Sequence, residues 1–212
     1  MKRIAPLLAW LDDPNPDAGI YELVGGTWHY SSWAELADDT YVAGAWLVDQ
    51  GVGPGDVVGI AIDRVRSFVA HFVGAQLVGA IPVVIRVPTR FESPAIYTSR
   101  TGGIVETAAP AVTVVGDAHR SAVAAAANAS RLIAPAAMGR GGAVIRPPRA
   151  RASETALVQF TSGSSGDPRG VVISQRKRSK GKGKASFVRV TCRDGCVFYG
   201  GFFVDSGVHW RK

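Results

Sequence analysis

Hydrophobic residues recur every three to four positions in two segments of the first half of the chain, residues 33–50 and 64–78. Ser32 directly precedes the first segment, and Glu35 lies three residues after Ser32, which is the spacing of a capping box. A glycine follows each repeat, and glycine readily adopts the left-handed conformation that ends a helix. The pattern therefore predicts two amphipathic helices.

Short apolar runs between and after these two helices predict buried strands. The runs cover residues 57–62, 81–87 and 111–115. A further helix is predicted to begin at Ser93–Pro94, and the alanine-rich stretch 119–129 favours another. Strands that alternate with helices are typical of an α/β domain, so we expect a mostly parallel sheet flanked by helices.

The amino-acid composition of the chain changes after residue 138. Residues 139–153 (GRGGAVIRPPRARAS) are rich in glycine, proline and arginine and predict a linker. The segment 154–174 then predicts a strand, a polar loop and a second strand. We expect it to begin a second sheet with exposed edges, and so to open a second, β-rich subdomain after an α/β subdomain formed by residues 1–138.

Charge is distributed unevenly. The net charge of +7 is the sum of −1 over residues 1–174, with 14 Lys and Arg against 15 Asp and Glu, and +8 over residues 175–212, with 10 against 2. The last part is therefore predicted to be a basic tail of atypical composition. No aromatic residue interleaves with the charges of residues 176–184, which favours a solvated tail and makes nucleic-acid binding a third-ranked function.

The most apolar run, residues 68–85, contains His71, Gln76 and Pro82. These interruptions favour a buried helix and strand, with His71 in the core, and argue against a membrane span. Two cysteines cannot form a disulfide framework, and the short apolar stretch near the start is unlike a secretory signal, so a cytoplasmic protein is expected.

The loop between the two strands of segment 154–174 has the composition of a phosphate site. Backbone N–H groups that point into a concavity bind polyphosphate well, and glycines allow positive φ and close approach. Hydroxyl groups add neutral donors, and Arg169 adds a permanent positive charge with a forked donor. The predicted ATP phosphate-binding residues are Thr161, Ser162, Gly163, Ser164, Ser165, Gly166, Arg169 and Gly170.

Two other interpretations of this loop are less favoured. An ordinary hairpin turn rich in serine and glycine would need three glycines and one proline at these offsets by chance, which composition makes rare. A Walker A loop requires GxxxxGK[ST] and a following helix. Here a strand follows, so the loop is predicted to bind phosphate from a hairpin.

The segment ALVQFTSGSSGDPRGVVIS, residues 156–174, resembles the signature loop of the adenylate-forming (AMP-binding) superfamily, which includes acyl-CoA synthetases and fatty acyl-AMP ligases. Three upstream segments are similar to that family in the same order: 30–36, 51–58 and 74–83. The form Leu157–Val158–Gln159–Phe160 looks most like the fatty acyl-AMP ligases. The resemblance covers about residues 20–174 and implies the fold of the family's N-terminal subdomain.

The resemblance also implies an activity. Members of the family activate a carboxylic acid, here a fatty acid of lipid metabolism, with ATP and Mg²⁺ to give acyl-AMP and pyrophosphate. CoA or an acyl carrier protein then accepts the acyl group. The family usually has lysine where Arg169 stands.

After Ser174 the sequence departs from the family pattern, and the C-terminal motifs have no counterpart, so no catalytic residue is assigned. We therefore expect a truncated family member, with a catalytically inactive nucleotide-binding fragment or a frame-shifted gene product as the alternative. No metal site is predicted from the residues. Cys192 and Cys196 have a spacing that is poor for zinc.

Overall fold

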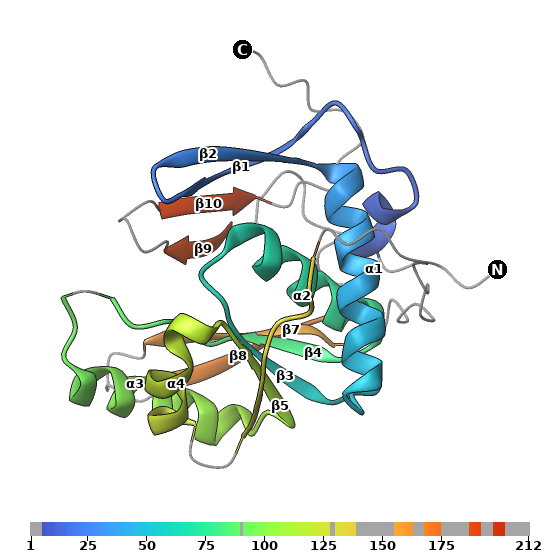
Figure 1. Cartoon of the computed structure of the whole chain (residues 1–212). Coiled ribbons are helices and arrows are strands. Elements are labelled where there is room, and N and C mark those ends of the chain that lie inside the picture. The colour runs from blue at the N-terminus through green and yellow to red at the C-terminus, as the bar shows by residue number, and fades with distance from the viewer. Residues whose placement is uncertain are drawn as a thin grey trace.

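The computed structural model describes residues 6–89, 91–127, 130–138, 155–162, 168–174, 187–191 and 197–201. Helices and strands alternate through most of this part of the chain (Figure 1). The helices are η1 (Pro6–Leu11), α1 (Trp33–Asp49), α2 (Val65–Leu77), α3 (Pro94–Ala108), η2 (Asp117–His119) and α4 (Arg120–Ala126). The strands are β1 (Gly19–Val24), β2 (Thr27–Ser32), β3 (Val57–Ala61), β4 (Ile81–Val84), β5 (Val112–Val115), β6 (Arg131–Ile133), β7 (Thr155–Ser162), β8 (Pro168–Ser174), β9 (Phe187–Thr191) and β10 (Val197–Gly201).

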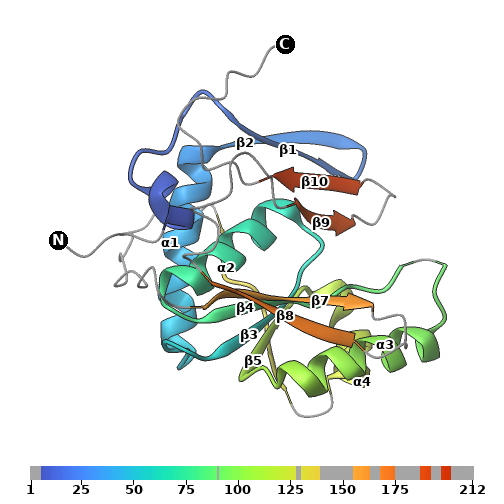
Figure 2. The same ribbon diagram turned by 180° about the vertical axis from the view of Figure 1, so that it is seen from behind.

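Six strands form the central sheet, in the order β6-β5-β3-β4-β7-β8. All neighbours are parallel except β7 and β8, which are antiparallel. Helices α1 and α2 lie on one side of this sheet, and α3 and α4 lie on the other (Figures 1 and 2). The predicted α/β fold with a mostly parallel, helix-flanked sheet is confirmed.

Successive side chains of the central strands point to alternate faces of the sheet, and this divides the hydrophobic core into two clusters. Val58 and Ile60 of β3 join the cluster under α1 and α2, whereas Val57 and Ala61 join the cluster under α3 and α4. Successive side chains of a strand point to opposite faces, so a strand that is apolar throughout needs cover on both faces. The two helical layers supply that cover.

The predicted capping box forms at the start of α1. The Ser32 hydroxyl accepts a hydrogen bond from the Glu35 backbone N–H at 3.2 Å, and the Glu35 carboxylate accepts one from the Ser32 N–H at 2.8 Å. The bond from the Ser32 backbone lowers the pKa of Glu35. Helix α3 begins as predicted with Pro94 in its first turn and continues through Gly102 and Gly103 to Ala108.

The hairpin of β1 and β2, which precedes α1, was not predicted from the sequence. Gly25 and Gly26 form its turn with φ of 56° and 84°, the left-handed values that a two-residue type I′ turn requires. Its Glu22 is buried and accepts hydrogen bonds from the Arg64 side chain at 2.9 Å and from the Val65 backbone N–H at 2.8 Å. Glu22 therefore caps α2, because the side chain of the N-cap residue Arg64 makes no capping hydrogen bond to the helix.

One expectation about the sheet is wrong. The strands of segment 154–174 were expected to open a second sheet, but β7 pairs with β4 and extends the first one. Leu157 packs under α1 and α2, and Val158 and Phe160 pack under α3, so β7 fits the same two-sided core as β3. The division of the chain into subdomains at residues 138 and 154 remains a prediction.

His71 is a core residue, as expected. Its side chain is fully buried in α2 and its ring packs edge-on against Trp46, with 5.7 Å between ring centroids. Nδ1 lies 2.7 Å from the Ser67 carbonyl oxygen, and Nε2 lies 2.9 Å from the Ala136 backbone nitrogen. Nδ1 therefore carries the proton and donates, while Nε2 accepts. None of the helices in the described ranges is long and apolar enough to cross a bilayer.

Candidate phosphate-binding hairpin

The structure brings four of the eight predicted phosphate-binding residues to the tip of the β7–β8 hairpin. Thr161 lies opposite Arg169, Ser162 lies opposite Pro168, and Gly170 lies opposite Phe160. The side chains of Thr161, Ser162 and Arg169 are outside the described part of the structure. Gly163, Ser164, Ser165 and Gly166 also lie outside the described residues.

The hairpin tip lies at the carboxyl edge of the parallel strands. Strand β7 runs parallel to β4, so residue 162 lies at the same edge as the ends of β3, β4 and β5. Asp63, Arg86 and His119 follow those three strands. Open α/β sheets bind ligands outside the carboxyl ends of their strands, and the described ends of the hairpin, at residues 162 and 168, lie at that edge.

Gly170 is needed for packing within the hairpin. A Cβ atom at this position would lie 3.2 Å from Cζ of Phe160 and 3.2 Å from Cγ1 of Val158. Its φ is outside the left-handed region, so the expectation of a positive φ does not hold here. The bare backbone of Gly170 instead makes room for the Phe160 ring across the strand pair.

A histidine–carboxylate pair lies at the same edge of the sheet. His119 Nε2 lies 2.8 Å from Asp63 Oδ2, and the His119 side chain is about nine-tenths buried. The pair joins the ends of β3 and β5, from segments 56 residues apart. The sequence alone does not identify Asp63 as the partner of His119, because the parallel pairing of β3 with β5 is what brings the two residues together.

The connection after β4 is held by a second ion pair. Arg86 Nη1 lies 2.7 Å from Glu92 Oε1, Nη2 lies 2.5 Å from Oε2, and the guanidinium lies over the Tyr97 ring. The Tyr97 hydroxyl donates to the Arg86 carbonyl at 2.9 Å, and burial raises the pKa of Tyr97. Arg86 thus fixes the loop beside β7, with its charge balanced by Glu92.

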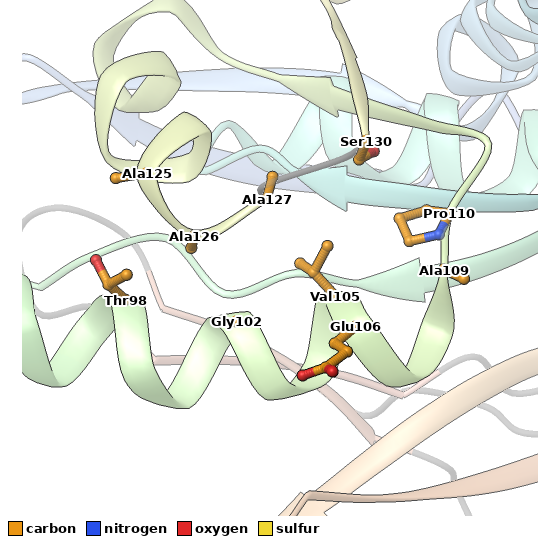
Figure 3. Close-up of a pocket in the computed structure, with 10 residues that line it drawn as sticks. All are labelled: Thr98, Gly102, Val105, Glu106, Ala109, Pro110, Ala125, Ala126, Ala127 and Ser130. Atoms are coloured by element: carbon orange, nitrogen blue, oxygen red, sulfur yellow. The ribbon is translucent and has the colours of Figure 1, made fainter.

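A separate pocket of about 700 Å³ lies between α3 and α4 (Figure 3). Val105 projects from α3 toward Ala127, and small side chains form much of the wall. Ala109 and Ser130 at its end precede β5 and β6, so that end lies at the amino edge of the sheet. Among the residues that the structure describes, no predicted phosphate-binding residue lines this pocket.

The described part of the chain holds no group of three His, Cys, Asp or Glu side chains that is arranged to bind a metal ion. A Mg²⁺ site is therefore not assigned to these side chains. The neutral and cationic donors predicted for the hairpin fit the phosphate groups of a nucleotide, which need donors and positive charge.

Comparison with known proteins extends these observations to a family. The family described as "AMP-binding enzyme" matches residues 12–191, which includes the hairpin and 17 residues beyond Ser174. The chain is 32% identical over 185 residues to a probable non-canonical nonribosomal peptide synthetase, CymA, from Salinispora arenicola. It is 27% identical over 151 residues to nonribosomal peptide synthetase 32 from Fusarium pseudograminearum. These matches cover 86% and 67% of this chain and 2% of each synthetase.

Solved structures share the fold. McyG A-PCP complexed with phenylalanyl-adenylate matches with a TM-score of 0.67 and 18% identity, over 82% of this chain and 29% of that one. The fatty acyl-adenylate ligase from L. pneumophila in complex with acyl adenylate and pyrophosphate matches with a TM-score of 0.65 and 21% identity, over 81% and 30%. The chain thus spans about 30% of the length of these two structures. With the family match across residues 12–191, the chain belongs to the AMP-binding enzyme family.

Proposed function

We propose that the tip of the β7–β8 hairpin binds the β- and γ-phosphates of ATP, as the polyphosphate-binding part of a carboxylic-acid adenylation. The observation that carries the proposal is the position of Thr161, Ser162 and Arg169 on a two-stranded tip at the carboxyl edge of the sheet. Membership of the AMP-binding family supports the assignment of the nucleotide.

Each residue type of the loop has a proposed role. The hydroxyl groups and backbone N–H groups donate hydrogen bonds to phosphate oxygens, and Arg169 adds a charged, forked donor. The contributing residues are Thr161, Ser162, Gly163, Ser164, Ser165, Gly166, Arg169 and Gly170. Gly170 acts through Phe160, because its lack of a side chain lets β8 approach β7 closely.

The proposed reaction places these donors on the leaving group. A carboxylate oxygen attacks the α-phosphorus of ATP and forms the new oxygen–phosphorus bond. The bond from the α-phosphorus to the bridging oxygen breaks, and pyrophosphate leaves with the electron pair. Donors fixed on the β- and γ-phosphates stabilise the charge that grows there and hold the α-phosphorus in place. Mg²⁺ would supply further charge neutralisation when bound with ATP.

We further propose a fatty acid as the substrate, CoA or an acyl carrier protein as the acceptor, and the cytoplasm as the location. The segment from Leu157 to Phe160 supports the fatty acid through its likeness to fatty acyl-AMP ligases. The synthetase relatives, and the phenylalanyl-adenylate in the McyG structure, favour an amino acid as the alternative. Pyrophosphate exchange into ATP that depends on amino acids and not on fatty acids would overturn the fatty-acid assignment.

Removing the Arg169 side chain is expected to weaken polyphosphate binding. Hydrogen bonds to charged groups contribute roughly 1.5–3 kcal/mol, so R169A should raise the Kd for Mg·ATP and for tripolyphosphate by about 10- to 100-fold. R169K keeps the charge and loses the fork, so an intermediate loss is expected. Isothermal titration of the purified chain measures both constants.

The matched control is R131A, because Arg131 is an exposed arginine on β6, at the opposite edge of the sheet from the hairpin. R131A should leave both constants within about twofold of the wild-type values. AMP lacks the β- and γ-phosphates and should bind far more weakly than ATP. Equal losses in R169A and R131A would show that general positive charge, and not the hairpin, attracts the nucleotide.

A further inference from the structure

The pocket between α3 and α4 has room for a small ligand that the proposed reaction does not use. Its volume is about 700 Å³, and Val105, Pro110 and Ala127 form part of an apolar wall (Figure 3). One end of the pocket lies at the amino edge of the sheet, whereas the hairpin tip lies at the carboxyl edge. The pocket is therefore separate from the candidate phosphate site.

Gly102 keeps the space between the two helices open. A Cβ atom at this position would meet only the Ala126 carbonyl oxygen, at 3.7 Å, so that oxygen faces α3 across the gap. Both residues line the pocket. A longer side chain at position 102 would occupy the gap.

The last turn of α3 presents carbonyl oxygens that lack helical donors. In a longer helix, the N–H groups of residues 110 and 111 would bond the carbonyl groups of Glu106 and Thr107. Pro110 has no N–H group, and the Ala111 N–H donates instead to the Val57 carbonyl oxygen at 2.9 Å. Carbonyl groups of a helix point toward its C-terminus, which here lies at Pro110 in the pocket wall. These oxygens can therefore accept hydrogen bonds from a ligand.

The lining of the pocket favours positive charge. Helices α3 and α4 both end at it, at Ala109 and Ala127, and a helix C-terminus carries a partial negative charge. Glu106 adds a carboxylate. No Lys, Arg or His is found among the described residues that line the pocket. A complementary ligand has a cationic donor group attached to a small apolar body.

We propose that this pocket binds a protonated aliphatic amine. The ammonium group donates hydrogen bonds to the carbonyl and carboxylate oxygens at the end of α3, and its hydrocarbon chain packs against Val105 and Ala127. Glu106 and the two helix ends oppose an anion of the same size, and a neutral alcohol gains the apolar contacts without the ionic ones. The proposal is independent of the proposed phosphate site.

The test is an NMR titration of the intact, isotope-labelled chain with hexylammonium, hexanol and hexanoate, which share one hydrocarbon chain and differ in charge. We expect hexylammonium to shift the amide resonances of residues 98–109 and 125–127, and to bind roughly fivefold or more tightly than hexanol. Hexanoate should bind more weakly than hexanol. Equal affinity for the cation and the alcohol would overturn the proposal, and so would the absence of shifts in these two segments with hexylammonium.

Three variants locate the site. Glu106→Gln keeps the shape and removes the charge, so it should weaken hexylammonium binding roughly threefold and leave hexanol binding unchanged. Asp49→Asn makes the same acid-to-amide change at an exposed position on α1, on the other side of the sheet, and should change neither. Gly102→Leu should abolish binding of both compounds, because its side chain fills the gap.

The Glu106→Gln comparison decides the matter even where Gly102→Leu fails to fold. Equal weakening of hexylammonium binding by Glu106→Gln and Asp49→Asn would overturn the proposal, because the amine would then respond to overall charge and not to this pocket. Unchanged binding in Glu106→Gln would also overturn it.

Discussion

Replacement of Gly74 by alanine is expected to lower the free energy of unfolding by about 2 kcal/mol, because α1 and α2 touch at this glycine. A Cβ atom there would lie 2.9 Å from the Gly44 backbone nitrogen, 3.1 Å from the Thr40 carbonyl oxygen and 3.2 Å from Cβ of Ala43. These neighbours are backbone or short side chains of α1, so the helices must separate. Alanine favours a helix over glycine by roughly 1 kcal/mol, and the overpacking outweighs that gain.

Gly102→Ala in α3 is the matched control, with the same change in a helix interior. Its Cβ would meet only the Ala126 carbonyl oxygen, at 3.7 Å, which is an ordinary contact. We expect this variant to be more stable than wild type by about 0.5–1 kcal/mol. Urea unfolding followed by circular dichroism measures both. Stabilisation by both substitutions would contradict the close helix crossing at Gly74.

Acidification from pH 6.5 to pH 4 is expected to destabilise the chain by about 3 kcal/mol through His71 alone. Burial lowers the pKa of His71 from 6.5 to about 4. In this range the unfolded chain takes up a proton that the folded chain excludes, so stability falls as the pH falls. Above pH 6.5 both states are neutral at this residue and the contribution is constant. Protonation of Nε2 also removes the acceptor of the Ala136 N–H.

The measurement is the unfolding free energy at a series of pH values for wild type and His71→Gln. The difference between the two proteins isolates His71 from other titrating groups, and it should change by about 1.4 kcal/mol per pH unit between the two pKa values. His29→Gln is the control, since His29 is exposed on β2. A difference between wild type and His71→Gln that does not vary with pH would show that His71 titrates normally.

Most helices and strands of the sheet could be predicted from the sequence, because capping residues and apolar runs lie within or next to the element that they mark. Ser32 and Glu35 mark the start of α1, and apolar runs mark β3 and β5. The β1–β2 hairpin was missed although Gly25–Gly26 between two alternating segments is a turn signal. The place of β7 was predicted wrongly, since a strand that is apolar on both faces fits the centre of any covered sheet.

The candidate site also combines local features with long-range ones. The glycines, the hydroxyl residues and Arg169 are close together in the sequence, so a phosphate-binding role could be predicted from their types and spacing. The Asp63–His119 pair and the hydrogen bond from the Gln76 side chain to the Ala156 carbonyl oxygen join segments 56 and 80 residues apart, and nothing in either segment identifies its partner. The order of strands in the sheet creates these contacts, so such long-range partners can be identified only once the strands are placed.

The most direct test of the central claim is the hydrogen-exchange footprint of Mg·ATP on the intact chain. We expect slower exchange in the presence of Mg·ATP across residues 155–174, with no change along α3 and α4, which border the other pocket. Slower exchange at α3 and α4 with none at residues 155–174 would contradict it, because the nucleotide would then lie between those helices and not on the hairpin.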